Sequence, residues 1–98
     1  MDCNQTIICG EIIKLGVLRY TPAGIAVIEF TVNHVSQQIE AGVARQIICE
    51  ILTVALGQLA LNIAGLKVNS KVKLTGFLNR KNRMNQQLVL HANHVVLI

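Results

Sequence analysis

Basic side chains concentrate in the second half of the chain, where they could bind phosphate groups. The part up to Glu50 holds all five carboxylates and three basic residues, and the part after it holds six basic residues, so the two parts carry −2 and +6. Lys and Arg drive phosphate binding because they release the counterions condensed on a polyanion. The charge asymmetry therefore predicts a polyanionic partner.

The basic residues of the second half follow two patterns. Lys71 and Lys73 alternate with apolar residues, which indicates that both lie on the open face of a strand. Arg80, Lys81 and Arg83 crowd a short polar stretch between two apolar segments, which predicts a charged hairpin tip. Such a face and tip could bind a single nucleic acid strand. The alternative is that the charges only keep the hairpin solvated and protect an exposed strand.

The remaining reactive residue types do not form a pattern that indicates catalysis or metal binding. The carboxylates are scattered, and the sequence has no serine nucleophile elbow and no glycine-rich phosphate loop. The three cysteines are an odd number without C-x-x-C spacing, and His91 and His94 would point to opposite faces of an extended segment. We expect no enzymatic activity, no metal, no cofactor and no disulfide framework.

Composition and length set the class of protein. A chain of 98 residues that is 52% hydrophobic is expected to form one domain over residues 1–98. Adjacent apolar pairs such as Ile7–Ile8 and Ile12–Ile13 would give the first strand two apolar faces, which favours a homodimer through that strand. The sequence has no apolar run of membrane-spanning length and no signal-peptide pattern, so we expect a cytoplasmic protein without a membrane partner.

The periodicity of apolar residues predicts an all-β domain with one short helix. Strands are expected over residues 5–20, 25–33, 45–54, 71–79 and 86–98. Residues 55–65 have apolar positions at helical spacing and end at Gly65, and residues 21–24 form a turn in which Gly24 can adopt positive φ. Three strands, a helix and two strands is the element order of an OB-fold, a five-stranded Greek-key barrel, although other antiparallel barrels share this order.

Five short motifs in a fixed order resemble the primosomal replication protein N (PriB) family, a bacterial relative of the single-stranded DNA-binding proteins. They are T21-P-A-G-I25, N33-H-V-S-Q-Q-I-E-A-G42, R45-Q46, G76-F-L78 and L88-V-L-H-A92, and they cover nearly the whole chain. The resemblance implies an OB-fold homodimer that binds single-stranded DNA with little sequence preference. It also implies a role in replication restart, in which the protein bridges DNA, the PriA helicase and a DnaT-like primosome protein.

The resemblance also implies where DNA would bind. The positions that match the family's basic DNA-binding residues are Arg45, Arg80, Lys81 and Arg83. Familiar members carry an aromatic residue just before the R-Q pair and a tryptophan shortly after it, whereas this chain has Val43 and Ile48 there. Because base stacking on an aromatic side chain contributes about 1 to 3 kcal/mol per base, we expect binding here to depend more on charge and on salt.

The chain has only three aromatic residues, Tyr20, Phe30 and Phe77. Phe30 is expected in the core, and Tyr20 at the barrel mouth or against a base. Phe77 shares the face of the strand lysines if the strand is regular, or turns inward if Gly76 marks a bulge. The predicted DNA-binding residues are Arg45, Lys71, Lys73, Phe77, Arg80, Lys81 and Arg83.

Three further interpretations follow from the same residues. His34 is expected to be a polar hairpin residue, and His91 to make a structural hydrogen bond. The missing aromatic residues and the apolar surplus also fit an OB-fold protein-interaction module with weak or no nucleic-acid binding. An RNA-binding OB module is a second alternative, because no residue pattern distinguishes the two sugars.

Overall fold

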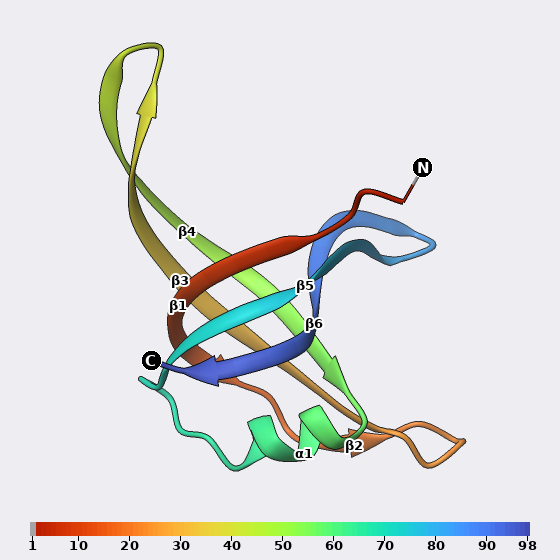
Figure 1. Cartoon of the computed structure of the whole chain (residues 1–98). Coiled ribbons are helices and arrows are strands. Elements are labelled where there is room, and N and C mark those ends of the chain that lie inside the picture. Colours follow the sequence, from red (N-terminus) through yellow and green to blue (C-terminus); the bar gives the residue numbers. More distant parts are fainter. Residues whose placement is uncertain (1) are drawn as a thin grey trace.

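The strands curl into a closed barrel from which two hairpins project in different directions (Figure 1). The computed structural model describes residues 2–98. Its elements are β1 (Thr6–Leu15), β2 (Arg19–Tyr20), β3 (Ala26–Glu40), β4 (Val43–Leu56), α1 (Gln58–Ala64), β5 (Lys71–Asn82) and β6 (Asn85–Leu97). The sheet order is β1-β5-β6-β4-β3-β2, and an additional pairing of β1 with β3 closes the barrel. Five long strands, a short helix and closure confirm the predicted OB-fold architecture.

The core lies inside the barrel and is built by residues that alternate along the strands. In β3 the side chains of Ile28, Phe30 and Val32 point inward, and Phe30 is only 1% exposed. The expected half-buried pattern and the core position of Phe30 are therefore confirmed. Helix α1 covers the lower end of the barrel in Figure 1 and buries Ala60 and Ile63.

Helix α1 is shorter than the predicted helix over 55–65. Ala55 and Leu56 still belong to β4, because they pair with Ile28 and Val27 of β3. The predicted end is confirmed, since the backbone N–H of Gly65 caps the last turn. Cross-strand pairing therefore takes precedence over helical spacing in the first residues of this segment.

The predicted single bent strand over 5–20 divides into β1 and β2. Residues 6–11 of β1 pair with β5, and residues 11–15 pair with β3. The pairing with β3 contains an irregularity between Ile12 and Lys14. The short β2 then pairs separately with β3. The bend was expected, but residues 16–18 belong to no strand and separate β1 from β2.

The β3–β4 hairpin is longer than predicted and extends beyond the barrel. Its register continues without interruption from Val27 opposite Leu56 to Glu40 opposite Val43. Ala41 and Gly42 have φ values of 51° and 77°, which fit a two-residue turn matched to strand twist. We call residues 34–49 the arm. Figure 1 shows it projecting alone at the upper left.

The shorter turn between β2 and β3 forms where the sequence indicated. Gly24 has a φ of 84°, and its N–H donates to the carbonyl oxygen of Thr21 at 2.8 Å. Within residues 2–98, no helix has both the length and the apolar character needed to cross a membrane.

Candidate nucleic-acid interface

Strand β5 presents its basic residues on the outer face of the barrel. Lys71 and Lys73 are exposed, whereas Val72 and Leu74 between them are fully buried. The predicted alternation is thus confirmed. Glu11 of β1 is the register partner of Lys71, so a carboxylate lies beside this lysine.

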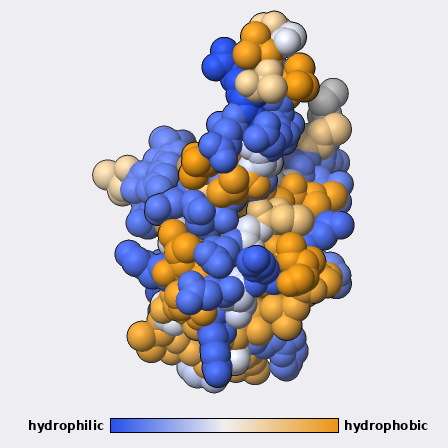
Figure 2. All heavy atoms as spheres, turned by 90° about the vertical axis from the view of Figure 1, so that its left-hand side faces the viewer, coloured by the Kyte–Doolittle hydropathy of each residue, from blue (hydrophilic) through white to orange (hydrophobic). Residues whose placement is uncertain are grey.

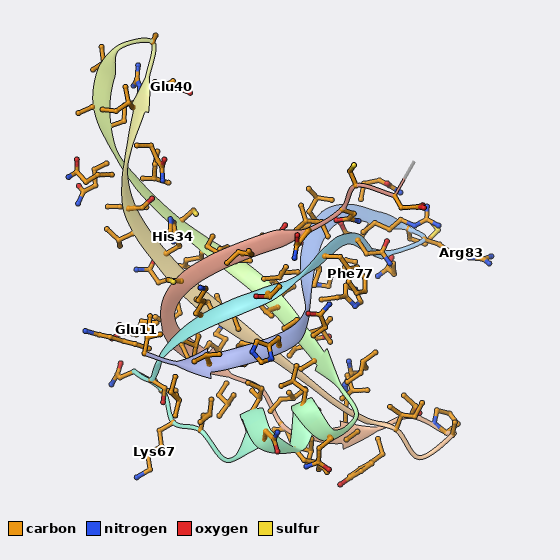
Figure 3. All side chains as sticks on the ribbon, in the orientation of Figure 1. Glu11, His34, Glu40, Lys67, Phe77 and Arg83 are labelled. Carbon is orange, nitrogen blue, oxygen red and sulfur yellow. The ribbon has the colours of Figure 1, made fainter. Side chains whose placement is uncertain are left out.

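The second basic group occupies the tip of the β5–β6 hairpin. Arg80 and Lys81 belong to the end of β5, which is longer than predicted, and Arg83 lies in the turn before Asn85. The side-chain oxygen of Asn82 accepts the backbone N–H of Met84 at 2.9 Å and shapes this turn. Arg83 points away from the barrel at the hairpin end (Figure 3).

The tip carries unneutralised positive charge. In residues 2–98 the acidic side chains form ion pairs only with Arg19 and Arg45. Arg80, Lys81 and Arg83 therefore have no carboxylate partner in the described chain, and all three are exposed. A cluster of this kind attracts phosphate groups.

Phe77 shares the outer face of β5 with Lys71 and Lys73 and lies between these lysines and the hairpin tip. Gly76 was expected to mark a bulge in β5, but the extra residue lies in the neighbouring strand β6. Thr75 pairs with His94 and Gly76 pairs with Ala92, so Asn93 of β6 has no partner in β5. The alternation of β5 therefore continues, and Phe77 stays outside with 39% of its surface exposed. This decides between the two predicted orientations of Phe77.

His91 is the direct partner of Phe77 across the β5–β6 ladder. The ring centroids of Phe77 and His91 are 5.0 Å apart, and the ring planes differ by 11°. An offset stack of this geometry is favourable. We expected a structural hydrogen bond for His91, but in the described chain the contact that its ring makes is this stack.

Arg45 lies apart from the other predicted residues. It belongs to the arm, where it forms a 3.0 Å ion pair with Glu40. Figure 3 shows Glu40 at the end of the arm and Arg83 at the end of the other hairpin, on opposite sides of the molecule. The structure thus aligns Lys71, Lys73, Phe77, Arg80, Lys81 and Arg83 along one hairpin and separates Arg45 from them.

One part of the surface was missed by sequence reasoning. A hollow of about 160 Å³ lies on the outside of the barrel, and five strands contribute to its lining. The lining residues are Arg19 of β2, Glu29 of β3, Leu52 and Val54 of β4, Lys81 of β5, and Val89 and His91 of β6. The parallel pairing of Val54 with His91 brings these strands together. The sequence signal available was His91 in the L-V-L-H-A run, and nothing in the sequence connects it with Arg19.

The remaining histidine and cysteine residues are structural or exposed. Nδ1 of His34 donates to the carbonyl oxygen of Cys9 at 2.7 Å, and Nε2 lies 2.7 Å from the hydroxyl of Ser36, so the ring connects the arm to β1. Cys3, Cys9 and Cys49 are exposed free thiols. Residues 2–98 do not gather three His, Cys, Asp or Glu side chains in a metal-binding group.

Comparison with known proteins connects this geometry to a family. Residues 4–94 match the family described as "Another single-strand binding protein family". The replication restart protein PriB of Nitrosomonas europaea is 43% identical over 95 residues, which cover 97% of this chain and 88% of the relative. The corresponding protein of Photorhabdus laumondii is 35% identical and covers 100% of this chain and 96% of the relative.

Solved structures agree with the sequence relatives. PriB from Ralstonia solanacearum superposes with a TM-score of 0.90 at 26% identity and covers 98% of both chains. The single-stranded DNA binding protein from Thermus aquaticus gives a TM-score of 0.78 at 18% identity over 97% of this chain and 50% of that one, a likeness of fold alone.

The barrel, its basic hairpin and the matched family define a protein of the single-strand binding class, a class of binding proteins rather than enzymes. Within that class the chain belongs to the replication restart protein PriB family. The resemblance read from the five motifs is therefore confirmed.

Proposed function

We propose that residues 1–98 act as one OB-fold domain that binds single-stranded DNA through the β5–β6 hairpin in replication restart. The observation that carries this proposal is the cluster of Arg80, Lys81 and Arg83, which has no carboxylate partner in residues 2–98. Each of these cations can neutralise one phosphate, and the flexible backbone of a single strand can follow a curved hairpin. The family match supports this choice of ligand.

The two strand lysines extend the proposed surface along the barrel. Lys73 and Lys81 are eight residues apart on β5, a distance of roughly 27 Å at 3.4 Å per residue. Phe77 lies midway between them. A DNA strand that contacts both basic groups would therefore pass an exposed aromatic ring.

Arg45 is a secondary contact in this proposal. Its ion pair with Glu40 is exposed, and exposed pairs contribute only about 0 to 1 kcal/mol. A phosphate could therefore displace Glu40 at little cost. Binding there requires a strand that reaches the arm as well as the β5–β6 hairpin.

Fluorescence anisotropy of a labelled oligo-dT across a salt series tests the proposal. The triple variant Arg80→Ala/Lys81→Ala/Arg83→Ala should reduce the slope of log K against log salt by about 2, at about 0.7 for each lost phosphate contact. The matched pair Lys81→Ala and Lys67→Ala changes the charge equally. Only Lys81→Ala should change the slope, because Lys67 lies across the molecule from the hairpin (Figure 3). Equal slopes for the native chain and the triple variant would refute the proposed site.

The same assay separates DNA from RNA. Competition by unlabelled oligo-dT and oligo-U of equal length would give the preference directly. Preference for oligo-U would favour the RNA-binding alternative over the proposed function.

We also propose that the chain acts as a cytoplasmic homodimer. Residues 6–10 of β1 pair with β5 along one edge, whereas pairing with β3 begins at Glu11. In the described chain the second edge of residues 6–8 is therefore unpaired, and the carbonyl oxygen of Cys9 is bound by the His34 ring. An open edge can pair with the same edge of a second copy across a two-fold axis. Sedimentation equilibrium should then give twice the chain mass of 10.7 kDa. A single chain mass at micromolar concentration would contradict the dimer.

The proposed partners in restart are the PriA helicase and a DnaT-like primosome protein. The relatives are replication restart proteins, which supports a restart role, and the proposed DNA site would leave most of the arm available for protein contacts. Retention of purified PriA on immobilised oligo-dT loaded with this chain would test the bridge. Equal retention without the chain would contradict it.

A protein-interaction module is the second candidate function, and exposed apolar residues on the arm favour it. Val35, Ile39, Val43 and Ile48 are all exposed large apolar side chains. Apolar atoms gather at the arm's tip, at the top of Figure 2. If the native chain bound no oligo-dT at low salt, this candidate would replace the DNA-binding function.

A further inference from the structure

We propose that Asn4 positions the DNA-binding hairpin, an inference that rests on the proposed DNA-binding function. Residues 2–5 precede β1 and lie beside the β5–β6 hairpin (Figure 1). The Asn4 side chain makes two hydrogen bonds with the backbone of Leu78. Its Nδ2 atom donates to the Leu78 carbonyl oxygen at 2.9 Å, and its Oδ1 atom accepts the Leu78 N–H at 3.0 Å. One side chain thus satisfies both backbone groups of this residue of β5.

The contact between Asn4 and Leu78 continues the ladder between β1 and β5. The last register pair of that ladder is Thr6 opposite Gly76, and Asn4 and Leu78 each lie two residues beyond it. Two residues is the repeat of an antiparallel ladder, so Asn4 lies where the next pair of the same kind would form. Its amide therefore takes the place of a neighbouring strand at the outer edge of β5.

The pair of Leu78 and Leu90 is the last rung of the hairpin that is supported from both sides. Leu90 is the partner of Leu78 in β6, and it also pairs with Thr53 of β4. Asn4 supports the β5 side at the same level. In the described chain, the strand pairing of residues 79–89 is with one another only. A two-stranded hairpin is marginally stable alone, so its order depends on the support at its base.

The basic residues of the tip all lie beyond this rung. Arg80, Lys81 and Arg83 follow Leu78 by two to five residues. A DNA strand binds the three cations together only while the hairpin keeps its shape. If the base frays, the binding-competent population falls, and the apparent affinity falls with it. Asn4 is therefore a positioning residue, which acts on DNA binding through Leu78 rather than by contact with DNA.

Amide hydrogen exchange of Asn4→Ala tests the contact itself. Exchange at Leu78 should become about 5- to 150-fold faster, the factor that corresponds to two hydrogen bonds of ordinary net strength. Exchange in residues 79–89 should also become faster, whereas the amide of the buried Val72 should not change. The matched control is Asn62→Ala, at an exposed position of α1, which should leave the hairpin amides unchanged.

Affinity for oligo-dT tests the positioning role. Asn4→Ala should weaken binding by about 5-fold, and by no more than the exchange factor, because bound DNA has to restore only the order that the variant lost. The slope of log K against log salt should stay the same, because no cation is removed. Asn62→Ala should bind like the native chain.

Aspartate at position 4 should make the contact depend on pH. A protonated carboxyl group can donate to the Leu78 carbonyl oxygen and accept its N–H as the amide does, whereas an ionised carboxylate can only accept. Relative to the native chain at the same pH, Asn4→Asp should therefore exchange fast at Leu78 at pH 7 and approach the native rate below about pH 4. Its relative affinity should recover over the same range.

Gln5→Glu is the matched control for the added charge. It introduces an ionisable carboxyl group at the next position, which is exposed, and keeps Asn4 in place. Its affinity corrects for the repulsion between a carboxylate and DNA. Exchange at Leu78 in this variant should equal that of the native chain at both pH values.

The outcomes distinguish this inference from the function on which it rests. If the native chain binds oligo-dT and Asn4→Ala binds it equally tightly, the positioning role is refuted and the DNA-binding function stands. Unchanged exchange at Leu78 in Asn4→Ala would refute the contact. If the native chain binds no oligo-dT, the function and the positioning role both fail. Should Asn4→Ala not fold, the comparison of Asn4→Asp with Gln5→Glu decides, and fast exchange at Leu78 in Asn4→Asp at low pH would contradict the proposal.

Discussion

Substitution of Gly76 by alanine should destabilise the barrel and disturb the Phe77–His91 stack together. The new Cβ atom would collide with the His91 carbonyl oxygen and would lie 2.8 Å from the His91 carbonyl carbon and 3.0 Å from the Cα atom of Ala92. All three are backbone atoms, so no side-chain rotation can relieve the contacts. Strands β5 and β6 must move apart at the position where Phe77 stacks on His91.

The expected magnitude follows from overpacking. Forcing extra atoms into a packed site costs typically about 1 to 3 kcal/mol. For a domain of this size each kcal/mol lowers Tm by about 4 to 8 °C. Thermal unfolding followed by far-UV circular dichroism measures this change in Tm. All variants are compared at one protein concentration, because the Tm of a dimer depends on concentration.

Gly65→Ala is the matched control. Gly65 has a φ of −83°, and a Cβ atom there would meet the carbonyl oxygen of Asn62 at 3.5 Å, an ordinary contact. We expect this variant to gain about 0.4 to 1 kcal/mol, because alanine restricts the unfolded chain. If Gly76→Ala unfolded at or above the native temperature, the close approach of β5 and β6 would be refuted.

Three further predictions concern the core, the arm and its arginine. Phe30→Ala removes a side chain that is 1% exposed and should reduce the free energy of unfolding, measured by urea titration, by about 3 to 5 kcal/mol. An unchanged urea midpoint would contradict the placement of Phe30 in the core. His34→Ala removes the hydrogen bonds of the ring to Cys9 and Ser36, and each of these contributes about 0.5 to 1.5 kcal/mol. Amide hydrogen exchange should therefore become faster in the arm and stay unchanged in α1. Arg45→Ala should change the salt slope of oligo-dT binding by less than Lys81→Ala does, and an equal or larger change would move the DNA site to the arm.

The barrel could be predicted from sequence because burial leaves a clear periodic pattern. Ile28, Phe30 and Val32 alternate with outward residues, and the helical spacing before Gly65 marks the change of element. The arm could not be predicted in the same way. It is a two-stranded hairpin with both faces exposed, so residues such as Gln37 and Ile39 carry no burial pattern.

The basic hairpin was predictable for a different reason, since charge clusters are visible in the sequence itself. The hollow was not predictable, because Arg19, Val54 and His91 meet only through strand pairings between distant segments. The bulge also lay outside sequence reasoning. Gly76 was a plausible marker, but the extra residue is Asn93 in the opposite strand, and this assignment decides where Phe77 points.

The most direct test of the DNA-binding account is an NMR titration of the ¹⁵N-labelled chain with unlabelled oligo-dT. The account predicts that amide shifts change along β5 and β6 from Phe77 through the hairpin tip to His91, and at Arg19. Helix α1 should change little, and the arm tip around Ala41 should change less than the β5–β6 hairpin because Arg45 is only a secondary contact. Shifts confined to the arm, or no shift at saturating oligo-dT, would contradict the account.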